Sequence, residues 1–164
     1  MTLIRLNNQS LTNVTALPAG AGGKVLQFLN FPFSTQVTTN STSFISLGTP
    51  AIEGSITPSS ASSKILIRFT TSVFQQGTNK NAYITIFRGT VSSGTNLGSS
   101  SEGFVRLYHS GGQTVDNVTI ECVDTPNTTS AVTYQLGFRS SDTTTHKFIM
   151  NNTPAQLIIM EIAG

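Results

Sequence analysis

Few residues in this sequence could perform catalysis, and they are widely spaced. The seven carboxylates are Glu53, Glu102, Asp116, Glu121, Asp124, Asp142 and Glu161. A glycosidase needs two carboxylates that face each other roughly 5–9 Å apart. Glu121 and Asp124 are three residues apart on an expected strand, so side-chain alternation turns them to opposite faces. We therefore predict that the protein has no catalytic residues and is not an enzyme.

The histidines and the single cysteine do not form a metal-binding motif either. We expect His109 to be a solvated turn residue, and His146 to be an outward strand residue or a contact at a symmetry axis. Cys122 alternates with Val118 and Ile120, which predicts a small buried residue rather than a reactive thiol. The sequence thus predicts no metal site and no cofactor.

The segment GAGGK at 20–24 superficially resembles a phosphate-binding loop. The full pattern requires Gly, four residues and then Gly-Lys-Ser/Thr. Pro18 stands where the first glycine belongs, and Val25 replaces the hydroxyl residue. We interpret the segment as a flexible hinge.

The composition indicates the character of the surface. Forty-five of the 164 residues are Ser or Thr, whereas only nine are Lys or Arg and seven are Asp or Glu. A typical soluble domain has about a quarter charged residues, and this chain has 10%. The surface must therefore consist largely of hydroxyls and amides, which respond little to salt or pH. Such a surface suits an exposed particle better than an enzyme pocket.

Several partner classes are disfavoured. The net charge is +2 and the basic residues are scattered, whereas nucleic-acid binding requires a basic cluster. No apolar run approaches the roughly 20 residues that a membrane span requires. The first residues lack the apolar core of a secretory signal. We expect a protein that is made in a cytoplasm and leaves it, if at all, by a route other than secretion, with no nucleic-acid partner and no membrane span.

Short apolar runs with period-two alternation predict an all-β fold. In the clearest run, 64–74, Ile65, Ile67, Phe69 and Val73 share one face. The further expected strands are 24–28, 34–38, 43–47, 51–56, 81–88, 104–108, 114–124, 131–139, 145–150 and 156–162. This pattern favours an antiparallel two-sheet β-sandwich, jelly-roll-like, with an immunoglobulin-like sandwich as the second choice.

Two parts are expected in the chain. Residues 1–23 form an extended N-terminal arm and Gly-rich hinge, and residues 24–164 form the β-sandwich body. The arm is apolar enough to need a partner surface, either on its own body or on a neighbouring subunit. Its predicted attachment residues are Leu3, Ile4, Leu6, Leu11, Val14 and Leu17.

The expected strands 81–88 and 156–162 are apolar on both faces, although a sandwich strand normally needs one dry face. Their second faces must meet a loop, the arm or another subunit. We predict a homo-oligomer with closed symmetry, most simply a trimer. The predicted interface residues are Tyr83, Phe87, Ile158, Met160 and Ile162.

Hydroxyl-rich loops could bind a host-surface glycan. The possible receptor residues are Gln76, Asn79, Asn96, His109 and Gln113. There is no Trp to supply an aromatic platform, and the three tyrosines alternate with apolar residues as core or interface residues do. A soluble carbohydrate-binding module therefore stays an alternative to a structural protein.

Four segments carry a family resemblance: ALPAGAGGKVLQ at 16–27, SITPSSASSKILI at 55–67, VDTPNTTSAVTYQLGF at 123–138 and QLIIMEI at 156–162. Together they resemble a family of tail-fibre and other virion-surface proteins of tailed bacteriophages, especially aquatic phages such as cyanophages. The resemblance implies a trimeric β-sandwich head on a virion, which serves host attachment without catalysis.

The sequence departs from that family in one respect. Fibre proteins of this kind carry a long shaft before the head, and here 23 residues precede the sandwich. We therefore keep three roles open: a short tail fibre or receptor-binding head, a head fibre, and a capsid decoration protein that clamps capsid subunits. In each role the other virion proteins are the expected partners.

Overall fold

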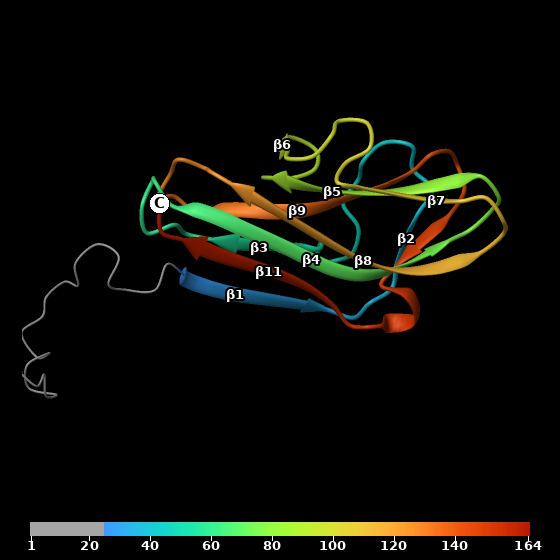
Figure 1. Cartoon of the computed structure of the whole chain (residues 1–164), viewed down its shortest axis with the longest axis horizontal. Coiled ribbons are helices and arrows are strands. Elements are labelled where there is room, and N and C mark those ends of the chain that lie inside the picture. Colours follow the sequence, from blue (N-terminus) through green and yellow to red (C-terminus); the bar gives the residue numbers. More distant parts are fainter. Residues whose placement is uncertain (1–24) are drawn as a thin grey trace, which may run out of the picture.

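The computed structural model describes residues 25–164, which form two facing antiparallel sheets (Figure 1). The first sheet contains β1 (Val25–Phe33), β2 (Val37–Thr39), β4 (Lys64–Gln75), β8 (Thr114–Asp124), β10 (His146–Phe148) and β11 (Ala155–Ile162). The second contains β3 (Glu53–Ile56), β5 (Lys80–Arg88), β6 (Thr95–Asn96), β7 (Val105–His109) and β9 (Val132–Ser140). The single-turn helix η2 (Met150–Asn152) precedes β11. The predicted all-β sandwich is confirmed.

The strand order identifies the sandwich as a jelly roll. The main strands of the first sheet follow the order β1-β11-β4-β8, and those of the second follow β3-β9-β5-β7. Chain neighbours such as β3 and β4 thus lie in different sheets, as in the eight-stranded double Greek key. The short strands β2, β6 and β10 extend these sheets. The predicted jelly roll is therefore correct, and the immunoglobulin-like alternative is not.

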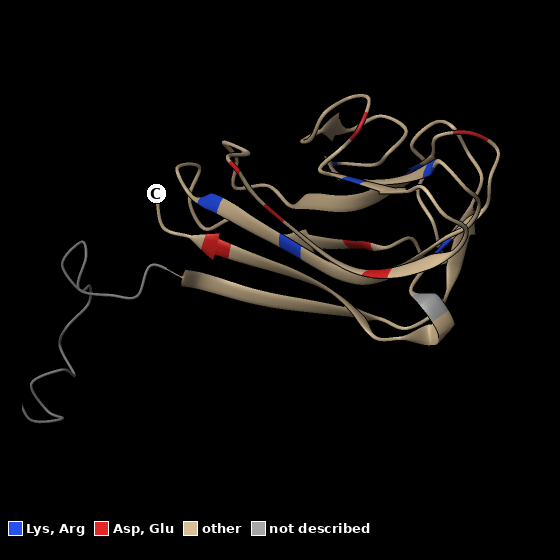
Figure 2. Ribbon diagram, turned by 45° about the vertical axis from the view of Figure 1, so that its right-hand side comes forward, with Lys and Arg blue, Asp and Glu red and all other residues tan. Residues whose placement is uncertain are grey.

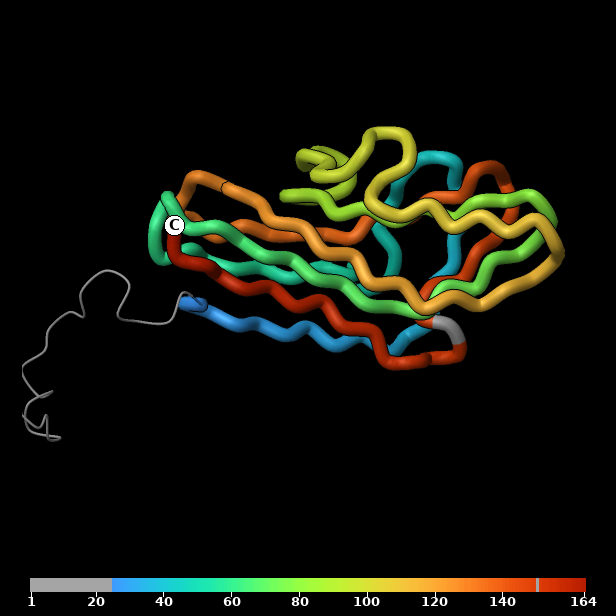
Figure 3. The backbone as a smooth tube through the Cα atoms, in the orientation of Figure 1, coloured from blue at the N-terminus to red at the C-terminus, as the bar shows by residue number. Residues whose placement is uncertain are grey.

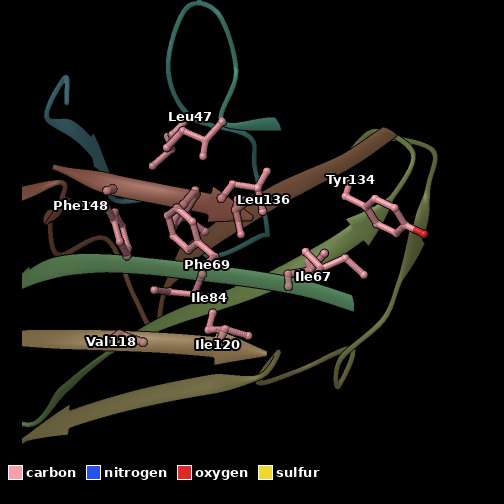
Figure 4. Close-up of a cluster of buried hydrophobic side chains, with 14 of the residues drawn as sticks. Leu47, Ile67, Phe69, Ile84, Val118, Ile120, Tyr134, Leu136 and Phe148 are labelled. Carbon is pink, nitrogen blue, oxygen red and sulfur yellow. The ribbon is translucent and has the colours of Figure 1, made fainter. Parts of the chain in front are cut away.

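The core lies between the sheets and follows the predicted alternation (Figure 4). Ile65, Ile67, Phe69 and Val73 of β4 are all fully buried. Phe138 of β9 lies at its centre, with its ring centroid 6.3 Å from that of Phe69 and 4.5 Å from that of Phe148. These contacts join both sheets.

Some element boundaries differ from the prediction. Residues 31–33 belong to β1 instead of following it. Pro32 does not end the strand because β1 lies at the edge of the sheet, where a missing N–H is tolerated. In the expected strand 43–47, Ile45 alone bridges to Phe138, before the turn at Gly48 and Pro50. The Ser/Gly-rich loop after β5 contains β6, which was not predicted.

The two ends of the sandwich differ in character. At one end, called the terminal end, Val25 of β1 pairs with Ile162 of β11, which also pairs with Lys64 of β4. The chain enters the body and finishes there (Figures 1 and 3). At the opposite, distal end lie the β4–β5 loop (76–79) and the β7–β8 loop (110–113). Any attachment through the N-terminus therefore leaves the distal loops pointing away from it.

Charged residues are thinly spread over both sheets (Figure 2). The described part of the chain contains ion pairs at Lys80–Asp142, Arg88–Asp124 and Arg106–Glu102. Its hydroxyls bond one another across strands, as Ser55 and Thr133 do at 2.7 Å, and within loops, as Thr90 and Ser93 do at 2.8 Å. Within residues 25–164 no helix has the length and apolar character needed to cross a bilayer.

We expect Phe138→Ala to lower the free energy of unfolding by about 3–5 kcal/mol, because it removes a buried ring and leaves a cavity between the sheets. Urea unfolding followed by circular dichroism measures the change. The exposed Thr119→Ala is the control and should stay within about 0.5 kcal/mol of wild type. Equal losses for both variants would contradict the placement of the core.

Candidate interaction surfaces

The carboxylates singled out in the sequence do not converge. Asp124 points inward and is buried, whereas Glu121 is exposed on the outer face of β8. Asp124 accepts hydrogen bonds from the Tyr134 hydroxyl at 2.8 Å and from Arg88 Nη1 at 3.1 Å. Burial, and then the bond to Asp124, raise the pKa of Tyr134. This network fastens β8 to the second sheet.

Burial keeps both Cys122 and His146 in their uncharged forms. Burial, assisted by Asp124 and Glu121, raises the pKa of the Cys122 thiol to about 11, so the thiol stays protonated. His146 is fully buried, which lowers its imidazole pKa. Its Nδ1 accepts a hydrogen bond from the backbone N–H of Gln76 at 3.4 Å. The expectation of an outward residue or a symmetry-axis contact at His146 is wrong. Among residues 25–164, no three His, Cys, Asp or Glu gather as metal ligands.

A row of four apolar side chains crosses the outer face of the first sheet. Phe28 of β1 lies opposite Met160 of β11, Met160 lies opposite Leu66 of β4, and Leu66 lies opposite Val123 of β8. Phe28 and Val123, at the two ends, are 58% and 59% exposed. Directly opposite residues on one face have Cβ atoms about 4.5–5.5 Å apart, so these side chains form a continuous band.

The band widens towards the terminal end. Val25 and Leu26 are both exposed there, at a β-bulge opposite Ile162. On the other side of the row, away from the terminal end, the outward Ile158 of β11 extends the surface by one more residue. We call this surface the terminal patch; it comprises Val25, Leu26, Phe28, Leu66, Val123, Ile158, Met160 and Ile162. Lys64, Arg68 and Glu121 border it.

The sequence predicted three members of the terminal patch, namely Ile158, Met160 and Ile162. It missed the other five, although alternation already turned Leu66 away from the core face of its strand. Their proximity depends on the register between strands that are distant in sequence. Only the register unites them into one surface.

A buried carboxylate fixes the strands beneath the terminal patch. Glu161 is fully buried, and its Oε1 accepts bonds from the Ser59 amide and hydroxyl, both at 2.7 Å. Its Oε2 accepts a bond from Gln27 Nε2 at 2.6 Å. Burial alone would raise the pKa of Glu161, but these hydrogen bonds outweigh it and lower the pKa to about 2. The carboxylate thereby connects β1, β11 and the β3–β4 loop.

Tyr83 and Phe87, the other two predicted interface residues, are covered by their own chain. They are only 7% and 8% exposed. The Arg139 guanidinium lies 3.9 Å from the Tyr83 ring centroid, and the Phe44 ring meets Phe87 edge-on at 6.3 Å. Arg139 also donates to the Ser101 carbonyl, which ties a second loop over this face. The interface assignment of Tyr83 and Phe87 is therefore corrected to an internal contact.

Four of the five possible receptor residues gather at the distal end: Gln76, Asn79, His109 and Gln113. The backbone N–H of Asn79 donates to the His109 carbonyl at 2.9 Å, so the β4–β5 and β7–β8 loops lie side by side. His109 Nδ1 accepts from the Gly111 amide at 3.2 Å, as expected of a turn residue. Gln76, Asn79 and Gln113 are exposed.

Asn96 lies apart from that group, on β6. Its Oδ1 accepts from Thr85 Oγ1 at 2.5 Å and from the Gly98 amide at 3.0 Å, and its Nδ2 donates to the Ser99 carbonyl at 3.1 Å. These bonds shape the β5–β7 loop. The side chain is thus engaged within the chain.

Tyr108 supplies an exposed aromatic ring beside the distal loops. It is 55% exposed, and its hydroxyl donates to Asn79 Oδ1 at 2.7 Å. Arg106, on the same face of β7, is exposed and bonds Asn81 Oδ1 at 2.9 Å. The sequence interpretation placed this tyrosine in a core or interface; in the described chain it is neither buried nor stacked.

The predicted attachment residues Leu3, Ile4, Leu6, Leu11, Val14 and Leu17 lie outside the described residues. The proposed boundary between arm and body at residue 23 also falls there.

No family model and no curated protein matches this chain. Among solved structures, it is similar to a chain of infectious bursal disease virus Gt strain, with 11% identity and a TM-score of 0.40 over 85% of this chain and 39% of that chain. A chain of the Gx strain gives 13% identity and a TM-score of 0.34, over 84% of this chain and 37% of that chain. The chain thus spans under two fifths of these viral chains. The assignment to the jelly roll rests on the strand order described above.

We expect Glu161→Gln to destabilise the protein at pH 7 by roughly 1–3 kcal/mol, because the donating NH2 of the new side chain would face either the Ser59 donors or Gln27 Nε2, where the carboxylate offers an accepting oxygen. The wild-type carboxylate has a lowered pKa, so its contribution to stability is complete above about 4.5 and is lost as the pH falls towards about 2. Glu161→Gln should lack this part of the pH dependence. Urea unfolding of both proteins from pH 7 to pH 2 provides the test. Parallel curves would contradict the role of the carboxylate.

Proposed function

We propose that this protein is a non-enzymatic structural protein of a tailed-phage virion, exposed on the particle as a tail-fibre-type or receptor-binding head. The supporting observation is the opposition of its two ends. The chain enters at the terminal end, beside an exposed apolar surface, and exposes polar loops at the distal end. A component attached by its N-terminus and directed outward needs this arrangement.

The architecture and the surface agree with this role. Double-sheet jelly rolls are common in viral capsid and lectin domains, although the fold alone does not determine function. The surface is rich in Ser and Thr and poor in charge. The resemblance of four sequence segments to virion-surface proteins of tailed phages adds an independent reason. On this proposal the protein is made in the host bacterial cytoplasm and incorporated into the virion.

We further propose that the protein is a homo-oligomer, most simply a trimer, whose copies meet through the terminal patch. Ile158, Met160 and Ile162 are the members of that surface that the sequence already singled out. An apolar surface of this kind on one face of a soluble body marks a contact site. Capsid decoration is the second role we consider, because a body with one apolar face and an N-terminal strap also suits a clamp between capsid subunits. Cryo-microscopy of the particle separates the roles, since decoration requires copies on the capsid.

Deletion of residues 1–20 should leave the body folded and abolish its incorporation into particles, because the arm supplies the attachment. Circular dichroism checks the fold, and quantitative mass spectrometry of purified virions measures incorporation. Phe138→Ala, which weakens the fold without touching the arm, is a useful comparison. Normal incorporation of the deleted protein would refute the attachment role.

A host-surface glycan is the proposed receptor for the distal end, with Tyr108 as the aromatic platform beside Gln76, Asn79, His109 and Gln113. A half-exposed tyrosine suits a binding site because its ring makes apolar contact with the ligand while its hydroxyl stays hydrogen-bonded or hydrated. We expect Tyr108→Ala to reduce glycan binding at least tenfold, whereas Tyr108→Phe, which keeps the ring, should retain most of it. A glycan array followed by titration of the best ligand measures both variants. Unchanged binding by Tyr108→Ala would exclude this platform.

A further inference from the structure

The terminal patch is too small to hold two rigid bodies together by itself. The patch covers four strands about 4.8 Å apart and three rows of outward residues about 7 Å apart along the strands. Its area is therefore roughly 400 Å². A stable interface buries about 800 Å² on each partner. The shape matters as well: the row from Phe28 to Val123 runs across the strands as a narrow band. A single extended segment fits such a band better than a second flat face.

The N-terminal sequence supplies a segment of matching chemistry. Residues 3–17 contain the six apolar residues Leu3, Ile4, Leu6, Leu11, Val14 and Leu17. Arg5 is the only charged residue among them, and there is no carboxylate. The segment can therefore cover the patch without burying many charges, which would be costly. It also joins the body at Val25, which is itself part of the patch.

The spacer between segment and body favours a neighbouring copy. Residues 18–23, PAGAGG, separate Leu17 from Lys24 and Val25. Six extended residues span up to about 20 Å. A segment that covered its own sheet would start at the patch and need only a tight turn, whereas a spacer of this length lets it reach another body.

We infer that residues 3–17 of one copy lie across the apolar row Phe28–Met160–Leu66–Val123 of a second copy and strap the assembly together. The inference rests on the proposed homo-oligomer and names the contact that would hold it. It adds the area that the terminal patch lacks. It also gives the arm and the outer face of β11 one shared function.

Photo-crosslinking of the full chain tests this strap. The change Phe28→p-benzoylphenylalanine puts a probe on the row at a position that is 58% exposed, so the fold tolerates it. After irradiation, we expect a covalent dimer on a denaturing gel, with peptides from residues 1–17 attached at position 28. A probe at Asn117, an exposed residue on the same face towards the distal end, is the matched control and should give at least tenfold less dimer.

A second pair of variants checks the segment itself in the probe-bearing chain. Leu6→Asp should reduce the covalent dimer at least tenfold, whereas Asn8→Asp should not. Attachment to residues 1–17 within one copy, attachment to body residues, or a yield no higher than that of the Asn117 control would each overturn the strap. If the strap fails while sedimentation still shows an oligomer and virions still contain the protein, the proposed function stands. A monomer that is absent from virions would overturn both.

Discussion

The structure depends on β4, which is hydrogen-bonded on both sides. Along its length it pairs with β8 on one side, from Ile65 to Gln75, and with β11 and β10 on the other. Its alternating side chains therefore face two different environments for twelve residues. The inner set forms the centre of the core, and the outer set contributes Leu66 to the terminal patch. A shift of one residue in its register would exchange the two sets, so the core and the outer surface are determined together.

Two buried carboxylates add hydrogen bonds to the apolar packing of the core. Glu161 and Asp124 are buried at the terminal end without being isolated, since each accepts several hydrogen bonds. Both lie on strands of the first sheet and reach segments outside it or at its edge. The outer face near them can remain apolar because the strands are held from the inside. The contact surface and the fold thus rely on different residues of the same strands.

The sequence predicted the fold class and most strands because alternation is a local property. The run 64–74 matched β4 closely, and the inward placement of Ile65, Ile67 and Phe69 was confirmed. It misjudged Tyr83 and Phe87 because their cover comes from Phe44 and Arg139, which are distant in sequence. It misjudged His146 because its strand β10 has only three residues, which is too short for alternation to show which side chains face inward. The terminal patch was found in part, because its full extent requires the register of four strands.

Pro32 in β1 has a consequence for behaviour at high concentration. β1 is an edge strand, and an open edge can recruit further strands from other molecules until material precipitates. Proline has no N–H, so it removes one donor from the series that an incoming strand would need. Together with the bulge at Val25 and Leu26, it leaves only a short regular stretch of free edge. The protein can therefore reach a high concentration with less risk of forming amyloid-like deposits.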